Sequence, residues 1–159
     1  NGDPARFAAF ELLVVPDTID GFVGPLAGVL AGMLWAREKA PWVRKVASVS
    51  GDAPFLPADL VARLAAAVEH RGNAIAIAKS GDEVHPVIGL WPVALADDLD
   101  QALRAGLRKV LHWTDKRGTV PVMFDMIHVG HERIDPFFNA NTPEELAEAR
   151  RLMAVMEAS

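Results

Sequence analysis

The sequence contains no cysteine, which removes several classes of function. There is no disulfide framework, no thiolate metal site and no thiol nucleophile, and a reducing compartment is compatible with the chain. Long apolar runs are also missing: proline, glycine or charge interrupts each run well before the ~20 residues of a membrane span. A basic excess is missing too, since the net charge is −5, which argues against a general nucleic-acid surface. We therefore expect a soluble, cytoplasmic protein.

An initiator methionine and a signal peptide are absent as well. The chain opens on Asn1-Gly2-Asp3-Pro4, which has the character of a turn inside a longer sequence, so we expect further residues upstream of Asn1. The 159 residues present fit a single domain, and a domain of this size can bury roughly 70% of its unfolded surface.

Apolar periodicity and turn residues predict strands that alternate with helices. Segments 74–78 and 84–91 flank a Ser-Gly-Asp turn and are expected to pair as an antiparallel hairpin. The alternation otherwise favours an α/β fold with a mostly parallel sheet. The predicted strands are residues 12–15, 45–50, 74–78, 84–91 and 120–126, and the predicted helices are residues 4–10, 24–38, 57–71, 92–105, 107–114 and 142–156.

Asp52 is the strongest candidate for a functional residue. It follows a buried strand and Gly51, and two prolines hold it clear of the next helix. Ligands of open α/β sheets bind just outside the carboxyl ends of the strands, where Asp52 is expected to lie. The alternative is a helix cap, but the following helix is predicted to begin at Pro57, with Asp59 in its first turn. We therefore favour a metal or substrate contact for Asp52.

Asp17 also follows a β-branched strand, and it is expected at the same edge of the sheet. A pair of carboxylates there would suit oxygen ligation of Mg²⁺ or hydrogen bonds to a base or ribose. An Asx turn after Pro16 is an equally good interpretation of Asp17 alone.

The segment Gly24-Pro25-Leu26-Ala27-Gly28 opens a predicted helix. The free N–H groups and positive dipole end of such a terminus suit an anion or the carbonyl edge of a purine. We favour a ligand near Gly24, and close packing on the sheet as the reason for Gly28 and Gly32.

Histidines and cations give weaker signals. His85 precedes Pro86 at the mouth of a strand and could contact a ligand, although a half-exposed structural histidine is the more frequent case. His128 and His131 lie in a predicted loop without a third ligand nearby, so we reject a zinc site. A solvated helix face is the default interpretation of the basic cluster, but phosphate-rich ligands need such cations. The cluster consists of Arg104, Arg108, Lys109, Lys116 and Arg117.

The last helix is preceded by Asn139-Ala140-Asn141-Thr142. Thr142, Pro143 and Glu145 form a capping box with proline at the first helical position. The two asparagines have no evident structural task, so they are candidate ligand contacts.

Together these segments resemble the molybdenum cofactor guanylyltransferases. PDTIDGFVGPLAGVLAG, SVSGDAPFLPADLVARL, HPVIGLW and FFNANTPEELAEA match the motifs of that family in order over nearly the whole chain. The resemblance implies a Rossmann-like nucleotide-diphospho-sugar transferase fold with helices on both faces of the sheet. It also implies transfer of GMP from GTP to molybdopterin, with Mg²⁺ required and pyrophosphate released.

The resemblance also implies roles for particular residues. Asp52 would bind Mg²⁺ and nucleotide, Asp17 would contact the base of GTP, and Gly24, Pro25 and Leu26 would lie against guanine. The family opens with a strand and a glycine-rich loop for the triphosphate, a unit of at least roughly 30 residues that this sequence does not contain. The residues implied on the molybdopterin side are His85, Arg108, Lys109, Asn139 and Asn141.

Two alternatives remain open at the level of sequence. One is a related nucleotidyltransferase that acts on another small phosphorylated substrate. The other is a non-catalytic domain that binds a nucleotide or a partner protein. For the enzyme itself, the expected protein partners are those that make molybdopterin or receive the product, with no role for nucleic acid or a membrane.

Overall fold

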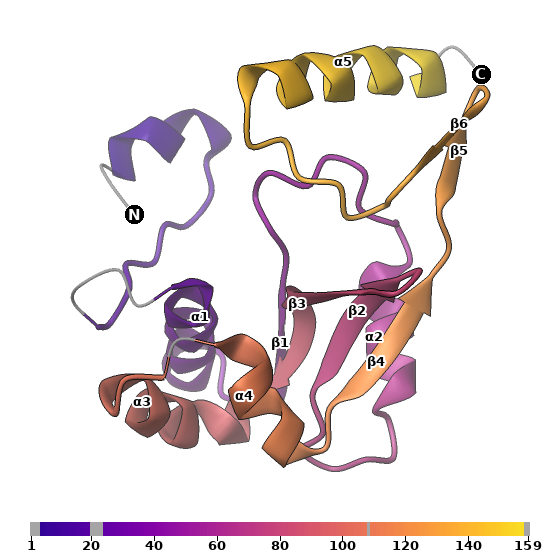
Figure 1. Cartoon of the computed structure of the whole chain (residues 1–159). Coiled ribbons are helices and arrows are strands. Elements are labelled where there is room, and N and C mark those ends of the chain that lie inside the picture. The colour runs from indigo at the N-terminus through magenta and orange to yellow at the C-terminus, as the bar shows by residue number, and fades with distance from the viewer. Residues whose placement is uncertain (1–3, 20–23, 108, 158–159) are drawn as a thin grey trace.

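The computed structural model describes residues 4–19, 24–107 and 109–157. Its centre is a four-stranded sheet in the order β1-β3-β2-β4 (Figure 1). The strands are β1 (Lys45–Ser48), β2 (Ala76–Ser80), β3 (Glu83–Pro92) and β4 (Val120–Phe124).

Strand direction only partly confirms the expected parallel sheet. β1, β2 and β4 run the same way, but β3 lies between β1 and β2 and is antiparallel to both. β2 and β4 form the parallel pair of this sheet. The predicted hairpin explains the difference, because β3 follows β2 through a tight turn and must return alongside it. Three of the four strands therefore run in the same direction, as expected for a mostly parallel sheet. Two of the three strand pairs are antiparallel, so the expectation is wrong for strand pairing.

Helices cover both faces of the sheet, as expected. α1 (Pro25–Lys39), α3 (Ala96–Arg104) and α4 (Val110–Thr114) pack on the face that carries Ile75, Ile77 and Trp91. α2 (Leu60–Ala67) packs on the other face through an apolar stripe. That stripe of Leu60, Leu64 and Val68 is buried against Ala74, Ala76 and Ala78. Alternate residues of β2 thus face opposite layers, as the pleat of a strand requires.

A third, smaller core joins the C-terminal part of the chain to the loop after β1. α5 (Pro143–Glu157) buries Ala149 and Leu152 against Phe55 and against a short hairpin. This hairpin consists of β5 (Ile127–Val129) and β6 (Glu132–Ile134), where a loop was predicted. Each strand has three residues, too few for an alternating pattern to be recognised.

The capping box of α5 is confirmed. The Glu145 N–H donates to Thr142 Oγ1 at 3.1 Å, and the Thr142 N–H donates to the Glu145 carboxylate at 2.9 Å. The Asn141 N–H donates to the same carboxylate at 2.8 Å. The asparagine segment is therefore fixed to the first turn of α5 through its backbone.

The strand predicted over residues 12–15 is wrong. After a 3-10 helix at Pro4–Phe10, residues 12–17 have no regular structure, and Leu12 and Leu13 are about 70% exposed. Figure 1 shows this segment apart from the sheet, so it has no neighbouring strand with which to form a ladder. Local apolar character is not sufficient for a strand without such a partner.

No helix within the described residues has the length and apolar character needed to cross a membrane. The remaining short elements are 3-10 turns at Val93–Leu95 and Asp115–Arg117, which extend α3 and α4 at one end each.

Candidate functional site

Asp52 lies in an exposed loop at the carboxyl end of β1. The strand ends at Ser48, and residues 49–59 lead to α2, whose N-cap is Asp59 rather than a residue near Pro57. A cap role for Asp52 is thereby excluded, because it lies a full loop upstream of the helix. Its carboxylate is exposed beside the glycine turn, which is the position expected for a metal or phosphate contact.

The structure brings Asp52 together with the asparagine segment. The Ala140 N–H donates to the Asp52 carbonyl oxygen at 2.9 Å, so Asn139 and Asn141 flank the point of attachment. Both asparagines are exposed. An open depression of about 300 Å³ lies here, lined by Gly51, Asp52, Pro54, Ala140 and Leu146.

The N-terminus of α1 lies beside the end of β1, where Pro25 and Ser50 line the same depression. Gly24 precedes the helix with a φ of +84°, a conformation that favours glycine, and Pro25 is the first helical residue. Leu26 is 1% exposed in the core, so its side chain cannot lie against a base as the sequence suggested. Contact with a ligand at this terminus is left to backbone groups and to Pro25.

Gly28 is placed differently from the prediction. A Cβ at Gly32 would lie 3.5 Å from Val46 Cγ1, which confirms close packing there, but a Cβ at Gly28 would meet nothing within 4 Å. Gly28 is exposed and lines a depression of about 430 Å³ between α1 and the end of β1. The wall opposite it includes Ser48, Val49 and Ser50, directly before the Asp52 loop.

The variant Gly28→Ala distinguishes a packing role for Gly28 from a role in ligand contact. Because the added methyl group meets open space inside a helix, we expect the variant to be more stable by about 0.5–1 kcal/mol. If nucleotide occupies this depression, the same methyl group should weaken nucleotide binding. Thermal unfolding with and without GTP measures both effects. A Gly28→Ala protein that is stabilised and binds GTP normally would remove this depression from the site.

His85 makes most of its contacts with other residues of the chain. Its side chain is only 12% exposed, and Nε2 lies 2.6 Å from Ser80 Oγ. The ring packs on Phe137 with a centroid distance of 4.6 Å. These contacts favour the structural interpretation of His85, and its assignment to the molybdopterin side stays a prediction.

Two cations of the basic cluster are paired with acids of α3. Arg104 Nε donates to Asp100 at 2.9 Å, and this hydrogen bond raises the pKa of the guanidinium. Arg117 Nε donates to Asp98 at 2.6 Å, and its guanidinium lies over the Trp113 ring. Such pairing leaves these two cations poorly suited to hold a phosphate.

Lys109 is exposed at the start of α4, where it lines a depression with Pro86. Lys109 does not line the depression beside Asp52, and its place on the molybdopterin side stays a prediction. Arg108 lies outside the described residues.

Comparison with known proteins identifies the family of this chain. Residues 1–120 match the family model of the MobA-like NTP transferase domain. The chain belongs to this family. It is 51% identical over 156 residues to the molybdenum cofactor guanylyltransferase of Bradyrhizobium sp. (strain ORS 278), covering 98% of this chain and 71% of that protein. It is 50% identical to the Rhodopseudomonas palustris (strain HaA2) protein of the same name, covering 96% of this chain and 69% of that protein.

A solved structure supports the fold. Molybdopterin-guanine dinucleotide biosynthesis protein A from Archaeoglobus fulgidus superposes with a TM-score of 0.67 at 21% identity, covering 94% of this chain and 72% of that chain. The MobA-like architecture is thus found in this chain despite the antiparallel β3. Membership of the family makes the chain a nucleotidyltransferase.

In this MobA-like domain Asp17 remains apart from the sheet. It is exposed in the irregular segment, and the strand that was expected to carry it to the edge beside Asp52 is not formed. The expected route to a pair of carboxylates is therefore wrong. A contact between Asp17 and the base of a nucleotide stays a prediction.

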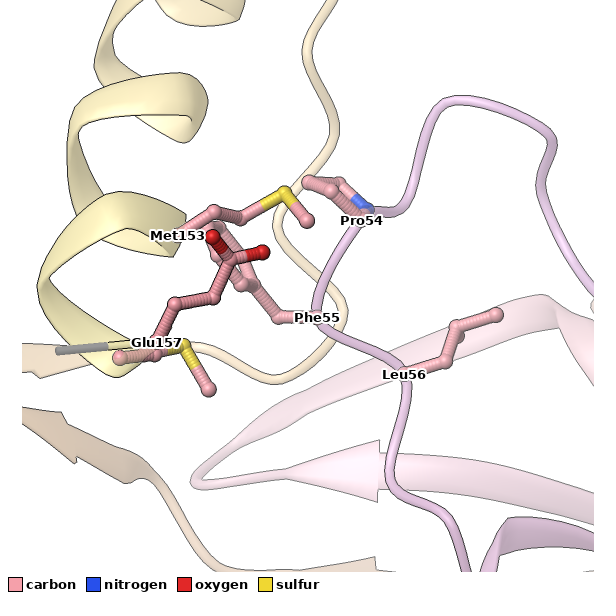
Figure 2. Close-up of a pocket in the computed structure, with 6 residues that line it drawn as sticks. Pro54, Phe55, Leu56, Met153 and Glu157 are labelled. Atoms are coloured by element: carbon pink, nitrogen blue, oxygen red, sulfur yellow. The ribbon is translucent and has the colours of Figure 1, made fainter. Parts of the chain in front are cut away.

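A second pocket adjoins the Asp52 depression and was not predicted. Figure 2 shows Met153 and Glu157 of α5 on one wall, and Pro54, Phe55 and Leu56 on the other. The pocket has a volume of about 270 Å³, and Pro54 lines both it and the Asp52 depression. Flexible methionines adapt to irregular apolar shapes. Sequence periodicity gave no sign of this pocket, because it forms only where α5 meets the loop after β1.

Proposed function

We propose that this chain transfers GMP from GTP to molybdopterin and releases pyrophosphate. The observation that carries the proposal is the place of Asp52. It follows Ser50, which lines the depression at the N-terminus of α1, and its carbonyl oxygen accepts the Ala140 N–H between Asn139 and Asn141. The names of the most similar relatives state the same activity for those proteins.

The two sides of Asp52 suit the two substrates. We assign GTP to the side of α1, because the helix terminus offers N–H groups and a positive dipole end to anionic or carbonyl oxygens. We assign the acceptor to the side of Asn139 and Asn141, whose amides can both donate and accept hydrogen bonds.

Mg²⁺ is the cofactor we propose, with Asp52 as its protein ligand. Within the described residues no three His, Cys, Asp or Glu side chains gather into a group able to hold a metal ion. A single exposed carboxylate nevertheless fits Mg²⁺, which keeps several waters and is bound through one or two carboxylates plus substrate phosphates. When bound, the ion would offset charge on the phosphates of GTP.

The chemistry requires positioning rather than a strong base. A terminal phosphate oxygen of molybdopterin is already anionic near neutral pH, and it attacks the α-phosphorus of GTP. The new P–O bond forms as the bond to pyrophosphate breaks, and the electron pair leaves with pyrophosphate. Asp52 and the asparagine segment hold the reacting groups in line, which is the main contribution that a protein makes to such a transfer.

The preference of the chain for GTP over ATP and CTP tests this proposal. Asp17 would accept hydrogen bonds from the N–H donors that guanine offers and adenine lacks on that edge. In thermal-shift titrations with Mg²⁺, GTP is expected to raise the unfolding midpoint more than ATP or CTP, since a tighter ligand stabilises the folded state more. Asp17→Ala should remove the preference, and Asp82→Ala, an exposed aspartate in the turn between β2 and β3, should retain it.

Equal shifts with the three nucleotides would contradict guanine selectivity. That result would favour a related nucleotidyltransferase with another substrate. No shift with any nucleotide would favour a non-catalytic domain.

A further inference from the structure

Two polar side chains of the β2–β3 hairpin meet a third from the chain segment that follows β6. Ser80 ends β2, His85 lies on β3, and Asp135 directly follows β6. Ser80 Oγ lies 2.6 Å from His85 Nε2 and 2.5 Å from Asp135 Oδ2. Ser80 is 1% exposed, and the His85 and Asp135 side chains are 12% and 23% exposed.

The chemistry of these groups sets the direction of each hydrogen bond. A carboxylate only accepts, so the single hydroxyl proton of Ser80 is donated to Asp135. The Ser80 oxygen must then accept from His85, which places a proton on His85 Nε2. This arrangement satisfies all three groups and leaves no free hydroxyl proton. It therefore makes Ser80 unsuited to act as a nucleophile activated by His85.

Asp135 also accepts hydrogen bonds from the backbone of the residues that follow it. Its Oδ1 accepts the Phe137 N–H at 2.7 Å, and its carbonyl oxygen accepts the Phe138 N–H at 3.1 Å. Phe137 is 2% exposed and packs between His85 and the edge of Phe124, with centroid distances of 4.6 and 5.3 Å. The chain is thus tied to the sheet immediately before Asn139.

Two contacts connect the anchored segment to the Asp52 loop. The Ala140 N–H donates to the Asp52 carbonyl oxygen at 2.9 Å, and the Phe138 ring lies against Phe55 at 6.1 Å. A continuous path therefore runs from the end of β2 to the loop that carries the candidate metal ligand. Loops without such anchorage are among the more mobile parts of a fold.

We infer that Ser80, His85 and Asp135 are positioning residues that hold Asn139 and Asn141 against the Asp52 loop so that the acceptor is presented to the nucleotide. This inference rests on the proposed function for the acceptor side of the site. The three residues touch no substrate themselves. They act through the backbone of residues 137–140.

Hydrogen exchange tests the anchorage without reference to activity. In Ser80→Ala and Asp135→Ala, the Ala140 amide is expected to exchange at least about 10-fold faster, because loss of a hydrogen bond to a charged group loosens the segment. Amides of α1 and β1 should be unchanged. Asp135→Asn can still accept from Phe137 and should lie between wild type and Asp135→Ala. Asp125→Ala, an exposed aspartate after β4, is the matched control and should exchange as wild type does.

Kinetics of the full-length enzyme test the consequence for the reaction. We expect the KM for molybdopterin to rise about 10-fold in Ser80→Ala and Asp135→Ala, with the KM for GTP within about 2-fold of wild type, since one hydrogen bond to a charged group accounts for a factor of this size. A general loss of structure would instead raise the KM for both substrates together, and that result would overturn the inference.

The hydrogen-exchange and kinetic measurements test different parts of the inference, and each can contradict its own part. Unchanged exchange at Ala140 in both alanine variants would overturn the anchorage. Faster exchange with an unchanged KM for molybdopterin would overturn the link to the acceptor, and would also contradict the assignment of Asn139 and Asn141 in the proposed function. If the alanine variants do not fold, Asp135→Asn must show an intermediate exchange rate and KM, and wild-type behaviour of that variant overturns the inference.

Discussion

Replacing Asp52 by asparagine is expected to lower the rate of GMP transfer at least about 100-fold, because metal-assisted stabilisation of charge contributes several kcal/mol and each 1.36 kcal/mol is a factor of ten. The amide has nearly the same shape as the carboxylate but lacks the charge that Mg²⁺ requires. The side chain is exposed in a loop, so the thermal midpoint should stay close to that of wild type. Steady-state transfer by the full-length enzyme at saturating GTP and Mg²⁺ is the measurement.

Asp59→Asn is the matched control for this variant. Asp59 lies at the far end of the same loop, is exposed, and makes no side-chain cap to α2. Its contact with Arg63 is long, at 3.9 Å, and exposed pairs of this kind contribute little. Asp59→Asn should therefore transfer GMP normally. Asp52→Asn with near-normal turnover would show that the metal, if one is used, is held elsewhere.

Replacing Gly89 by alanine is expected to destabilise the fold by about 3 kcal/mol, the upper range for an overpacked site. Gly89 lies in β3, paired with Ser48 of β1 and Ile77 of β2. A Cβ at this position would lie 2.7 Å from the Ala76 carbonyl oxygen and 3.3 Å from the Trp91 ring. The carbonyl belongs to the central ladder and cannot swing away as a flexible side chain could. The strands would therefore have to separate locally.

Thermal or denaturant unfolding measures this effect. For a chain of this size the expected loss corresponds to a fall of roughly 6–12 °C in Tm. Gly28→Ala is the control, since it adds the same methyl group in open space. A Gly89→Ala protein with the midpoint of wild type would mean that β2 and β3 can move apart at no cost, which their paired positions between two packed layers argue against.

Some of the site could be predicted from the sequence because the determining interactions are local. The strand, the glycine turn and the prolines around Asp52 act within a few residues of one another, and they place its carboxylate in an exposed loop whatever the rest of the chain does. The capping box of Thr142 and Glu145 is likewise closed within one helical turn. The apolar stripe of α2 is a property of that helix alone.

Other features depended on contacts between distant segments, and only the tertiary structure decided them. Residues 12–15 have the composition of a strand, but a ladder needs a neighbouring strand, and none lies beside them in the part of the chain that the structure describes. His85 has the sequence context of a ligand contact, yet Ser80 and Phe137 enclose it. The hydrogen bond between Ala140 and Asp52 joins two loops that no local pattern relates. The sequence by itself therefore determined the local setting of the candidate residues Asp52, Asn139 and Asn141. The fold determined that they meet, because pairing between distant segments depends on how the layers pack as a whole.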